Sequence, residues 1–153
     1  AVVNGLRAVQ WPGRLQRLLS GSLVENIPEG WELWLDGGHN SAAGEILAAQ
    51  ATGWWDKPLF GIWGMISSKE PDAFIMPLLP HMAALRTVAI PGEGASIDPA
   101  ALAGIAENLG AKVESASSLE RAVDDLMGLS RTPGRILICG SLYLAGVVLR
   151  END

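Results

Sequence analysis

The sequence has little of what several common protein classes require. Its single cysteine, Cys139, excludes an internal disulfide and a cysteine-based metal site. It has no run of basic residues, and its formal net charge of −6 argues against binding to nucleic acid or to an anionic membrane surface, since both need Lys and Arg. Its most apolar stretch, residues 136–149, is interrupted and is shorter than the ~20 residues that span a bilayer. We therefore expect a cytoplasmic protein with no nucleic-acid or membrane partner.

Motifs of common catalytic and cofactor sites are missing as well. The chain has no G-x-x-x-x-G-K-[ST] loop for phosphates, no His/Cys metal spacing and no nucleophile elbow. Gly37-Gly38 does not have the spacing of the G-x-G-x-x-G dinucleotide fingerprint. What the chain does have is 153 residues, 48% of them hydrophobic, which suffices for one domain with a single core.

Short apolar runs alternate with helix-forming stretches along the chain. This alternation predicts an α/β fold with a mostly parallel sheet of about six strands and helices on both faces. A strand between Arg14 and Leu19 is expected to pair antiparallel at one edge. Pro77 should kink the helix that Pro71 begins or cut it short, and Ser117 with Glu120 predicts a capping box. The expected strands are residues 31–35, 59–65, 85–90, 112–114 and 135–139, and the expected helices begin near residues 41, 71, 99, 118 and 142.

The candidate site residues follow from where ligands bind in such sheets. Ligands bind at the carboxyl ends of the strands, which selects the loops 36–40, 67–70 and 140–141. Asp36 could accept hydrogen bonds from a ribose, or its carboxylate could only stabilise the following helix by interacting with the positive end of the helix dipole. Asn40 could also be a helix cap, and the pattern favours a helix cap for Ser141. Lys69 could bind an anion or remain solvated.

Four segments resemble motifs of the bifunctional dihydrofolate synthase/folylpolyglutamate synthase family, a branch of the Mur-ligase superfamily. They occur in the family's order and extend over nearly the whole chain. Residues 11–16 resemble its W-P-G-R-[LF]-Q motif, residues 35–40 its L-D-G-A-H-N motif, and residues 139–144 its C-G-S-L-Y-L motif. Gly64-Met65 with Lys69-Glu70 is similar to G-M-x-x-x-K-D. Gly38 replaces the family's usual Ala, which we expect to be harmless, and Glu70 replaces its usual Asp.

The resemblance implies a Rossmann-like C-terminal domain, residues 14–153, preceded by a linker remnant, residues 1–13. Such a domain closes over a central ATPase domain, its expected partner, which carries the P-loop and the Mg²⁺ ligands and is absent from this chain. The family uses ATP and Mg²⁺ to join L-glutamate to dihydropteroate or folate. ATP phosphorylates the acceptor carboxylate, and the glutamate amine attacks the acyl phosphate. The isolated chain is therefore expected to be inactive.

The resemblance also implies roles for individual residues. Arg14 and Asp36 would contact ATP, the latter at the ribose. His39 and Ser141 would lie near the incoming glutamate or the transferring phosphoryl group, and the same loops add Lys69 and Asn40 as further candidates. No residue is expected to bind metal.

The face that carries Trp11, Arg14, Asp36 and His39 should form one wall of an interdomain cleft, with its polar groups unpaired inside this domain. Three alternatives remain open. The chain could be a stand-alone nucleotide- or ligand-binding module, a non-catalytic interaction domain, or the C-terminal domain of another Mur-type ligase.

Overall fold

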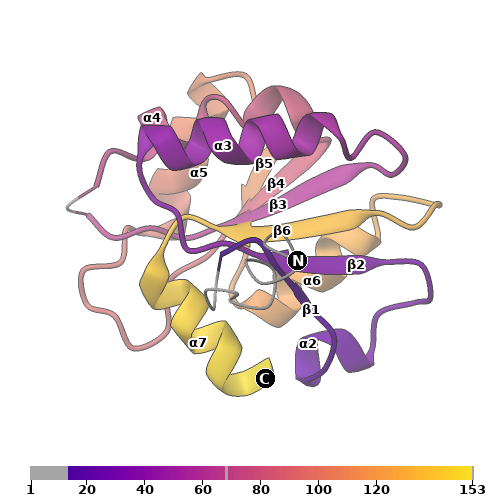
Figure 1. Cartoon of the computed structure of the whole chain (residues 1–153). Helices are drawn as coiled ribbons and strands as arrows, with labels where there is room; N and C mark the ends of the chain where they lie inside the picture. Colours follow the sequence, from indigo (N-terminus) through magenta and orange to yellow (C-terminus); the bar gives the residue numbers. More distant parts are fainter. Residues whose placement is uncertain (1–13, 68, 153) are drawn as a thin grey trace, which may run out of the picture.

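The structure, a computed structural model, describes residues 14–67 and 69–152 and has a six-stranded sheet at its centre (Figure 1). The strand order is β1-β2-β6-β3-β4-β5. The predicted number and sequence of strands are confirmed. Their bounds are β1 (Gln16–Leu18), β2 (Glu32–Leu35), β3 (Leu59–Trp63), β4 (Ala84–Thr87), β5 (Val113–Ser115) and β6 (Arg135–Cys139).

The predicted strand directions, a mostly parallel sheet with one antiparallel strand at an edge, are also confirmed. β1 pairs antiparallel with β2, so that Gln16 lies opposite Leu35, and all other neighbouring strands among the described residues are parallel. The last strand of the chain, β6, lies between β2 and β3. The loops that follow these three strands therefore meet at the middle of the carboxyl edge, the position where open α/β sheets bind ligands.

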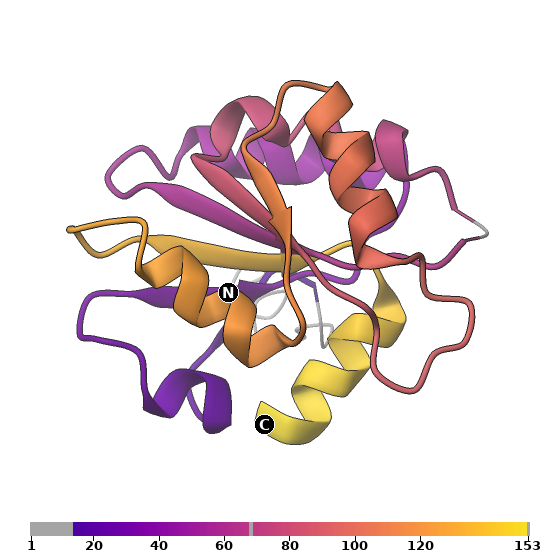
Figure 2. The ribbon, with the colours of Figure 1, turned by 180° about the vertical axis from the view of Figure 1, so that it is seen from behind.

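Helices cover both faces of the sheet (Figures 1 and 2). One face carries α3 (Ser41–Thr52), α4 (Pro71–Ile75), the 3₁₀ turn η1 (Leu79–His81) and α5 (Pro99–Asn108). The other carries α2 (Ser22–Glu25), α6 (Leu119–Met127) and α7 (Leu142–Asn152). Across the described part of the chain, each helix is too short or too polar to cross a lipid bilayer.

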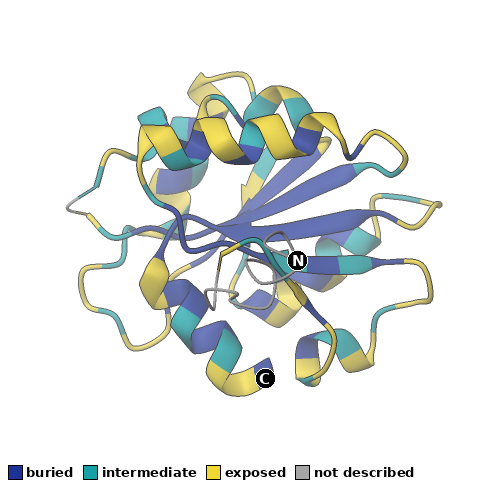
Figure 3. Ribbon diagram, viewed as in Figure 1, coloured by how far each residue is buried: buried dark blue, intermediate teal, exposed yellow. Residues whose placement is uncertain are grey.

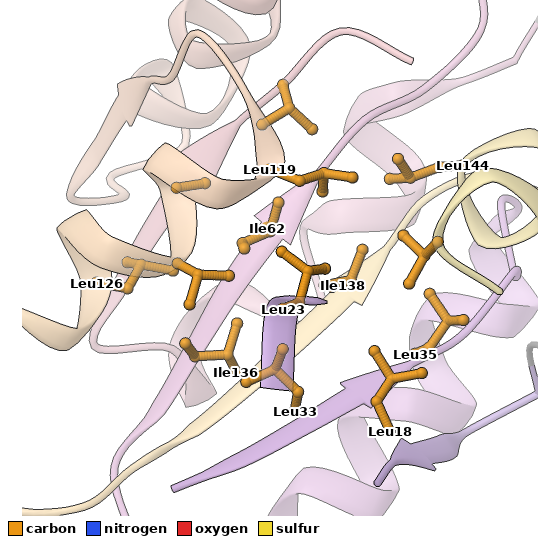
Figure 4. Close-up of a cluster of buried hydrophobic side chains, with 14 of the residues drawn as sticks. Leu18, Leu23, Leu33, Leu35, Ile62, Leu119, Leu126, Ile136, Ile138 and Leu144 are labelled. Carbon is orange, nitrogen blue, oxygen red and sulfur yellow. The ribbon is translucent and has the colours of Figure 1, made fainter. Parts of the chain in front are cut away.

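Side chains that alternate along the strands fill two apolar layers, one on each face. In β6, Ile136 and Ile138 join the layer beneath α6 and α7, whereas Leu137 and Cys139 join the layer beneath α3 to α5. Figure 3 shows that the strands are buried along most of their length, whereas the helices bury one side only. Figure 4 shows labelled side chains of the layer beneath α6 and α7, with Leu33 and Ile136 from the strands, Leu126 from α6 and Leu144 from α7.

The helix ends follow their capping and breaking residues, with one correction. Helix α4 starts at Pro71 and ends at Ile75, two residues before Pro77, as predicted. The predicted cap at Ser117 is wrong by one residue, because the Ser118 hydroxyl accepts the N–H of Arg121 at 3.0 Å. The later start makes Leu119 the first helical residue, which brings the apolar side of α6 onto the sheet; its buried residues are Leu119, Ala122, Val123 and Leu126.

Candidate functional site

A pocket of about 360 Å³ opens at the carboxyl edge, among the loops that follow β2, β3 and β6. It brings together three of the predicted site residues, His39, Lys69 and Ser141, one from each loop. No acidic side chain is among the described residues around it, which are His39, Ile66, Lys69, Gly140, Ser141, Leu142 and Tyr143. The pocket of this acidic chain is therefore locally favourable to an anion.

Two glycines allow the walls of the pocket to meet. Gly140 has φ 109°, a conformation that residues with a Cβ rarely adopt, and a Cβ there would overlap the Gly64 carbonyl oxygen. The same Cβ would lie 2.8 Å from Nε1 of the buried Trp63. The backbones that leave β3 and β6 therefore touch directly, and this contact fixes the position of Ser141 relative to the β3 loop.

Ser141 caps helix α7 at the back of the pocket. Its hydroxyl oxygen accepts hydrogen bonds from the N–H groups of Tyr143 at 3.0 Å and Leu144 at 3.3 Å. The capping interpretation of Ser141 is thus confirmed, and it does not exclude a role in binding. A hydroxyl that accepts two bonds still has its own hydrogen to donate, and in the described part of the chain no acceptor takes it.

Asn40 and Asp36 both accept hydrogen bonds from backbone groups of this domain. Asn40 caps α3 by accepting the Ala43 N–H at 2.8 Å, and it is not among the residues around the pocket. Asp36 is 7% exposed, and its two oxygens accept the N–H groups of Leu15 at 2.8 Å and Gly38 at 2.7 Å. The expectation that Asp36 would be unpaired within this domain is therefore wrong, because the chain turns back so that two amides reach the carboxylate.

The other residues of the expected cleft wall differ from one another in exposure. Arg14 is exposed and His39 is half-buried, whereas Trp11 lies outside the described residues. The ATP contacts predicted for Arg14 and Asp36 stay predictions. Gly38 is not a neutral replacement for Ala in this chain, because a Cβ there would lie 2.6 Å from the Ala43 Cβ and 2.7 Å from Asp36 Oδ2.

Leu142 and Tyr143 line the pocket, although sequence reasoning assigned them no role. They are 53% and 57% exposed in the first turn of α7, next to the half-buried Ile66 of the β3 loop. Large apolar side chains that follow a serine cap could have signalled this surface, but the same pattern is typical of buried helix starts. Within residues 14–67 and 69–152, no three His, Cys, Asp or Glu side chains gather as a metal site.

Cys139 lies at the end of β6 and is fully buried. Burial raises the pKa of its thiol well above the usual range, and the nearby Asp36 carboxylate raises it further. The thiol therefore stays protonated, and Cys139 is a packing residue.

This chain is similar in sequence and in structure to known folylpolyglutamate synthases. A probable bifunctional folylpolyglutamate synthase/dihydropteroate synthase of Halobacterium salinarum is 29% identical over 147 residues, which cover 94% of this chain and 16% of that protein. Mycobacterium tuberculosis folylpolyglutamate synthase, solved in complex with ADP and AMPPCP, superposes with a TM-score of 0.80 at 26% identity, over 97% of this chain and 34% of that one. The resemblance to folylpolyglutamate synthases is confirmed.

The fold recurs in a further solved synthase. The bifunctional folylpolyglutamate synthase/dihydrofolate synthase of Yersinia pestis, complexed with AMPPNP and Mn, superposes with a TM-score of 0.72 at 22% identity, over 95% of this chain. No family model matches the chain. The chain spans about a third of the length of these two solved synthases, at 34% and 32%.

Proposed function

We propose that this chain is the part of a folylpolyglutamate synthase that receives the incoming L-glutamate and closes over the ATP-binding part of the enzyme. The observation that carries the proposal is the single pocket shared by His39, Lys69 and Ser141 at the carboxyl edge of the sheet. These residues come from three loops, yet each presents a group that can donate a hydrogen bond to an anion.

The lining suits a small dicarboxylate. The Lys69 ammonium and the Ser141 hydroxyl can each donate to a carboxylate, and the positive end of the α7 dipole lies at Ser141. Ile66, Leu142 and Tyr143 offer apolar surface for the methylenes of glutamate. Pockets for small molecules commonly start near ~300 Å³, so the volume of about 360 Å³ is sufficient.

The proposed reaction is ATP-dependent amide formation. In the intact enzyme, phosphate transfer from ATP would activate the folate carboxylate as an acyl phosphate. The glutamate amine then forms the C–N bond, the C–O bond to phosphate breaks, phosphate leaves and the amine loses a proton. The residues of this chain would hold the glutamate so that its amine faces the acyl carbon.

The nucleotide and the metal place different demands on this chain. Arg14 is exposed beside the carboxyl edge and is the guanidinium that we propose for the nucleotide phosphates, with Asp36 behind it. The described residues do not fit Mg²⁺, because they provide no cluster of acidic ligands. We therefore assign metal binding to the rest of the enzyme.

The binding proposal is tested by titrating the ¹⁵N-labelled chain with L-glutamate and following its amide resonances. Shifts should concentrate at residues 39, 69 and 140–143. Lys69→Met and Ser141→Ala should each weaken binding roughly tenfold, which is the loss of one charge-assisted hydrogen bond. L-glutamine is the matched ligand control, since it differs only in the side-chain carboxylate. Shifts confined to other loops would contradict the proposal.

Activity provides a separate test. With ATP, Mg²⁺, L-glutamate and a folate, the isolated chain should release phosphate only at the background rate. Phosphate release that depends on the chain and is lost in Lys69→Ala would show that this part alone is a catalyst.

A further inference from the structure

We propose that Asp36 is a positioning residue, a latch that holds the corner formed by Arg14 and Leu15 against the loop between β2 and α3. The inference rests on the proposed function, because Arg14 is the residue assigned to the nucleotide phosphates. It gives Asp36 a task different from direct contact with the nucleotide.

The two oxygens of Asp36 bind two separate segments. Oδ1 accepts the N–H of Leu15, 21 residues earlier in the chain, and Oδ2 accepts the N–H of Gly38. The Asp36 backbone is itself fixed in the sheet, since its N–H donates to the Ile138 carbonyl at 2.9 Å. With 7% of the residue exposed, the carboxylate faces the protein; its bond to Gly38 is buried and its bond to Leu15 is partly buried.

Leu15 shows what the latch holds in place. It has φ 43° and is the only residue other than glycine with positive φ in the described ranges 14–67 and 69–152. This conformation is unfavourable for a residue with a Cβ and persists where the surroundings impose it. Here Leu15 donates its N–H to the Asp36 carboxylate. Gln16 then pairs with Leu35, so the corner lies at the end of β2 and Arg14 is presented at the carboxyl edge.

Gly38 completes the latch. A Cβ at this position would lie 2.7 Å from Asp36 Oδ2, so any larger residue would displace the carboxylate or the loop. Gly38→Ala therefore disturbs the latch while the charge of Asp36 remains. Asp36→Asn disturbs it differently, because an amide nitrogen cannot accept the second N–H.

The primary experiment measures hydrogen exchange of the Leu15 amide in the ¹⁵N-labelled chain. Asp36→Asn should accelerate this exchange roughly 10- to 100-fold, the loss expected for a hydrogen bond to a buried charged group. Gly38→Ala should also accelerate exchange of the Leu15 amide, and it replaces Asp36→Asn in the experiment if that variant does not fold. Asp98→Asn is the matched control, because Asp98 also precedes a helix but accepts no capping bond. Unchanged Leu15 exchange in a folded variant would overturn the latch.

A second measurement separates a latch from a ribose ligand. Binding of ATP and of adenosine to the chain is compared for Asp36→Asn and Arg14→Gln. If Asp36 is a latch, both variants should weaken the binding of ATP by similar factors and leave the binding of adenosine unchanged. If Asp36→Asn instead weakened the binding of adenosine and of ATP equally, the positioning role would be overturned. If the chain binds neither compound, the nucleotide proposal fails for the isolated chain, while the Leu15 exchange still decides the latch.

Discussion

Glu32 offers the sharpest test of the energetics, at the end of the sheet opposite the pocket. Its carboxylate is 12% exposed and accepts hydrogen bonds from Trp34 Nε1 at 2.9 Å, Lys57 Nζ at 3.1 Å and Arg135 Nε at 3.0 Å. Arg135 also pairs with Asp56 and lies over the Trp54 ring. We predict that Glu32→Gln destabilises the fold and that the loss depends on pH.

The size of the effect follows from the pKa of Glu32. Burial alone would raise the pKa, but the hydrogen bonds from Trp34, Lys57 and Arg135 outweigh it and lower the value from 4.5 to about 2. A shift from 4.5 to about 2 corresponds to about 3 kcal/mol. Water at the end of the sheet screens part of this interaction, so we expect a loss of about 2 kcal/mol at pH 7.

The direction of the pH dependence is set by the lowered pKa. The ionised form is favoured in the folded state, so the stabilisation is fully present above pH 4.5 and is lost as the pH falls towards 2. Urea unfolding of the native chain and of Glu32→Gln, measured from pH 7 to pH 2.5, should show a difference in unfolding free energy that shrinks below pH 4.5.

Glu45→Gln on the exposed side of α3 is the matched control and should change the unfolding free energy by less than about 0.5 kcal/mol at any pH. Two results would refute the reasoning. One is a difference between the native chain and Glu32→Gln that stays constant across the titration. The other is a Glu32→Gln chain as stable as the native one at pH 7, which would mean that desolvation cancels the three hydrogen bonds.

Three further changes test the carboxyl edge. Ser141→Ala should lower the unfolding free energy by about 1 kcal/mol through loss of the α7 cap, whereas an unchanged urea midpoint would show that the cap adds nothing. Gly140→Ala should lower the unfolding free energy by about 2 kcal/mol or more, because alanine disfavours the positive φ and its Cβ would overlap the Gly64 carbonyl oxygen. An unchanged unfolding free energy in the same titration would contradict this close approach. Cys139 should resist a thiol reagent at pH 8 until urea unfolds the chain, and rapid labelling of the folded protein would show that the β6 end opens readily.

Much of the fold could be predicted from the sequence because local signals agreed with one another. Pro71 and Pro77 delimit a short helix by removing backbone donors, whatever surrounds them. Gly140 followed by Ser141 marks a strand end and a helix start. The rule that ligands gather at the carboxyl ends of parallel strands then selected His39, Lys69 and Ser141, and these three residues do share one pocket.

The features that sequence reasoning missed depend on contacts between distant segments. Nothing near Asp36 in the chain indicates that its carboxylate is used by Leu15, because that bond forms only when β1 turns back beside β2. The preference for Gly38 over Ala has the same origin, since the space at Gly38 is taken by Asp36 and Ala43. The exposure of Leu142 and Tyr143 likewise depends on what covers the first turn of α7, which helical periodicity does not encode.

The composition of the pocket explains why it is proposed as one half of an active site. Among its described residues, Lys69 and Ser141 can donate hydrogen bonds and no carboxylate is present. Such donors suit an anionic substrate but not Mg²⁺, because an ammonium has no lone pair for a cation and the Ser141 oxygen already accepts two backbone N–H groups. Phosphoryl transfer depends on such a metal to neutralise developing charge, so the proposed role of this surface is to bind and orient glutamate and not to activate the acceptor. On the proposed function, the groups that activate the acceptor would face this pocket from the rest of the enzyme, with the exposed Leu142 and Tyr143 beside the opening.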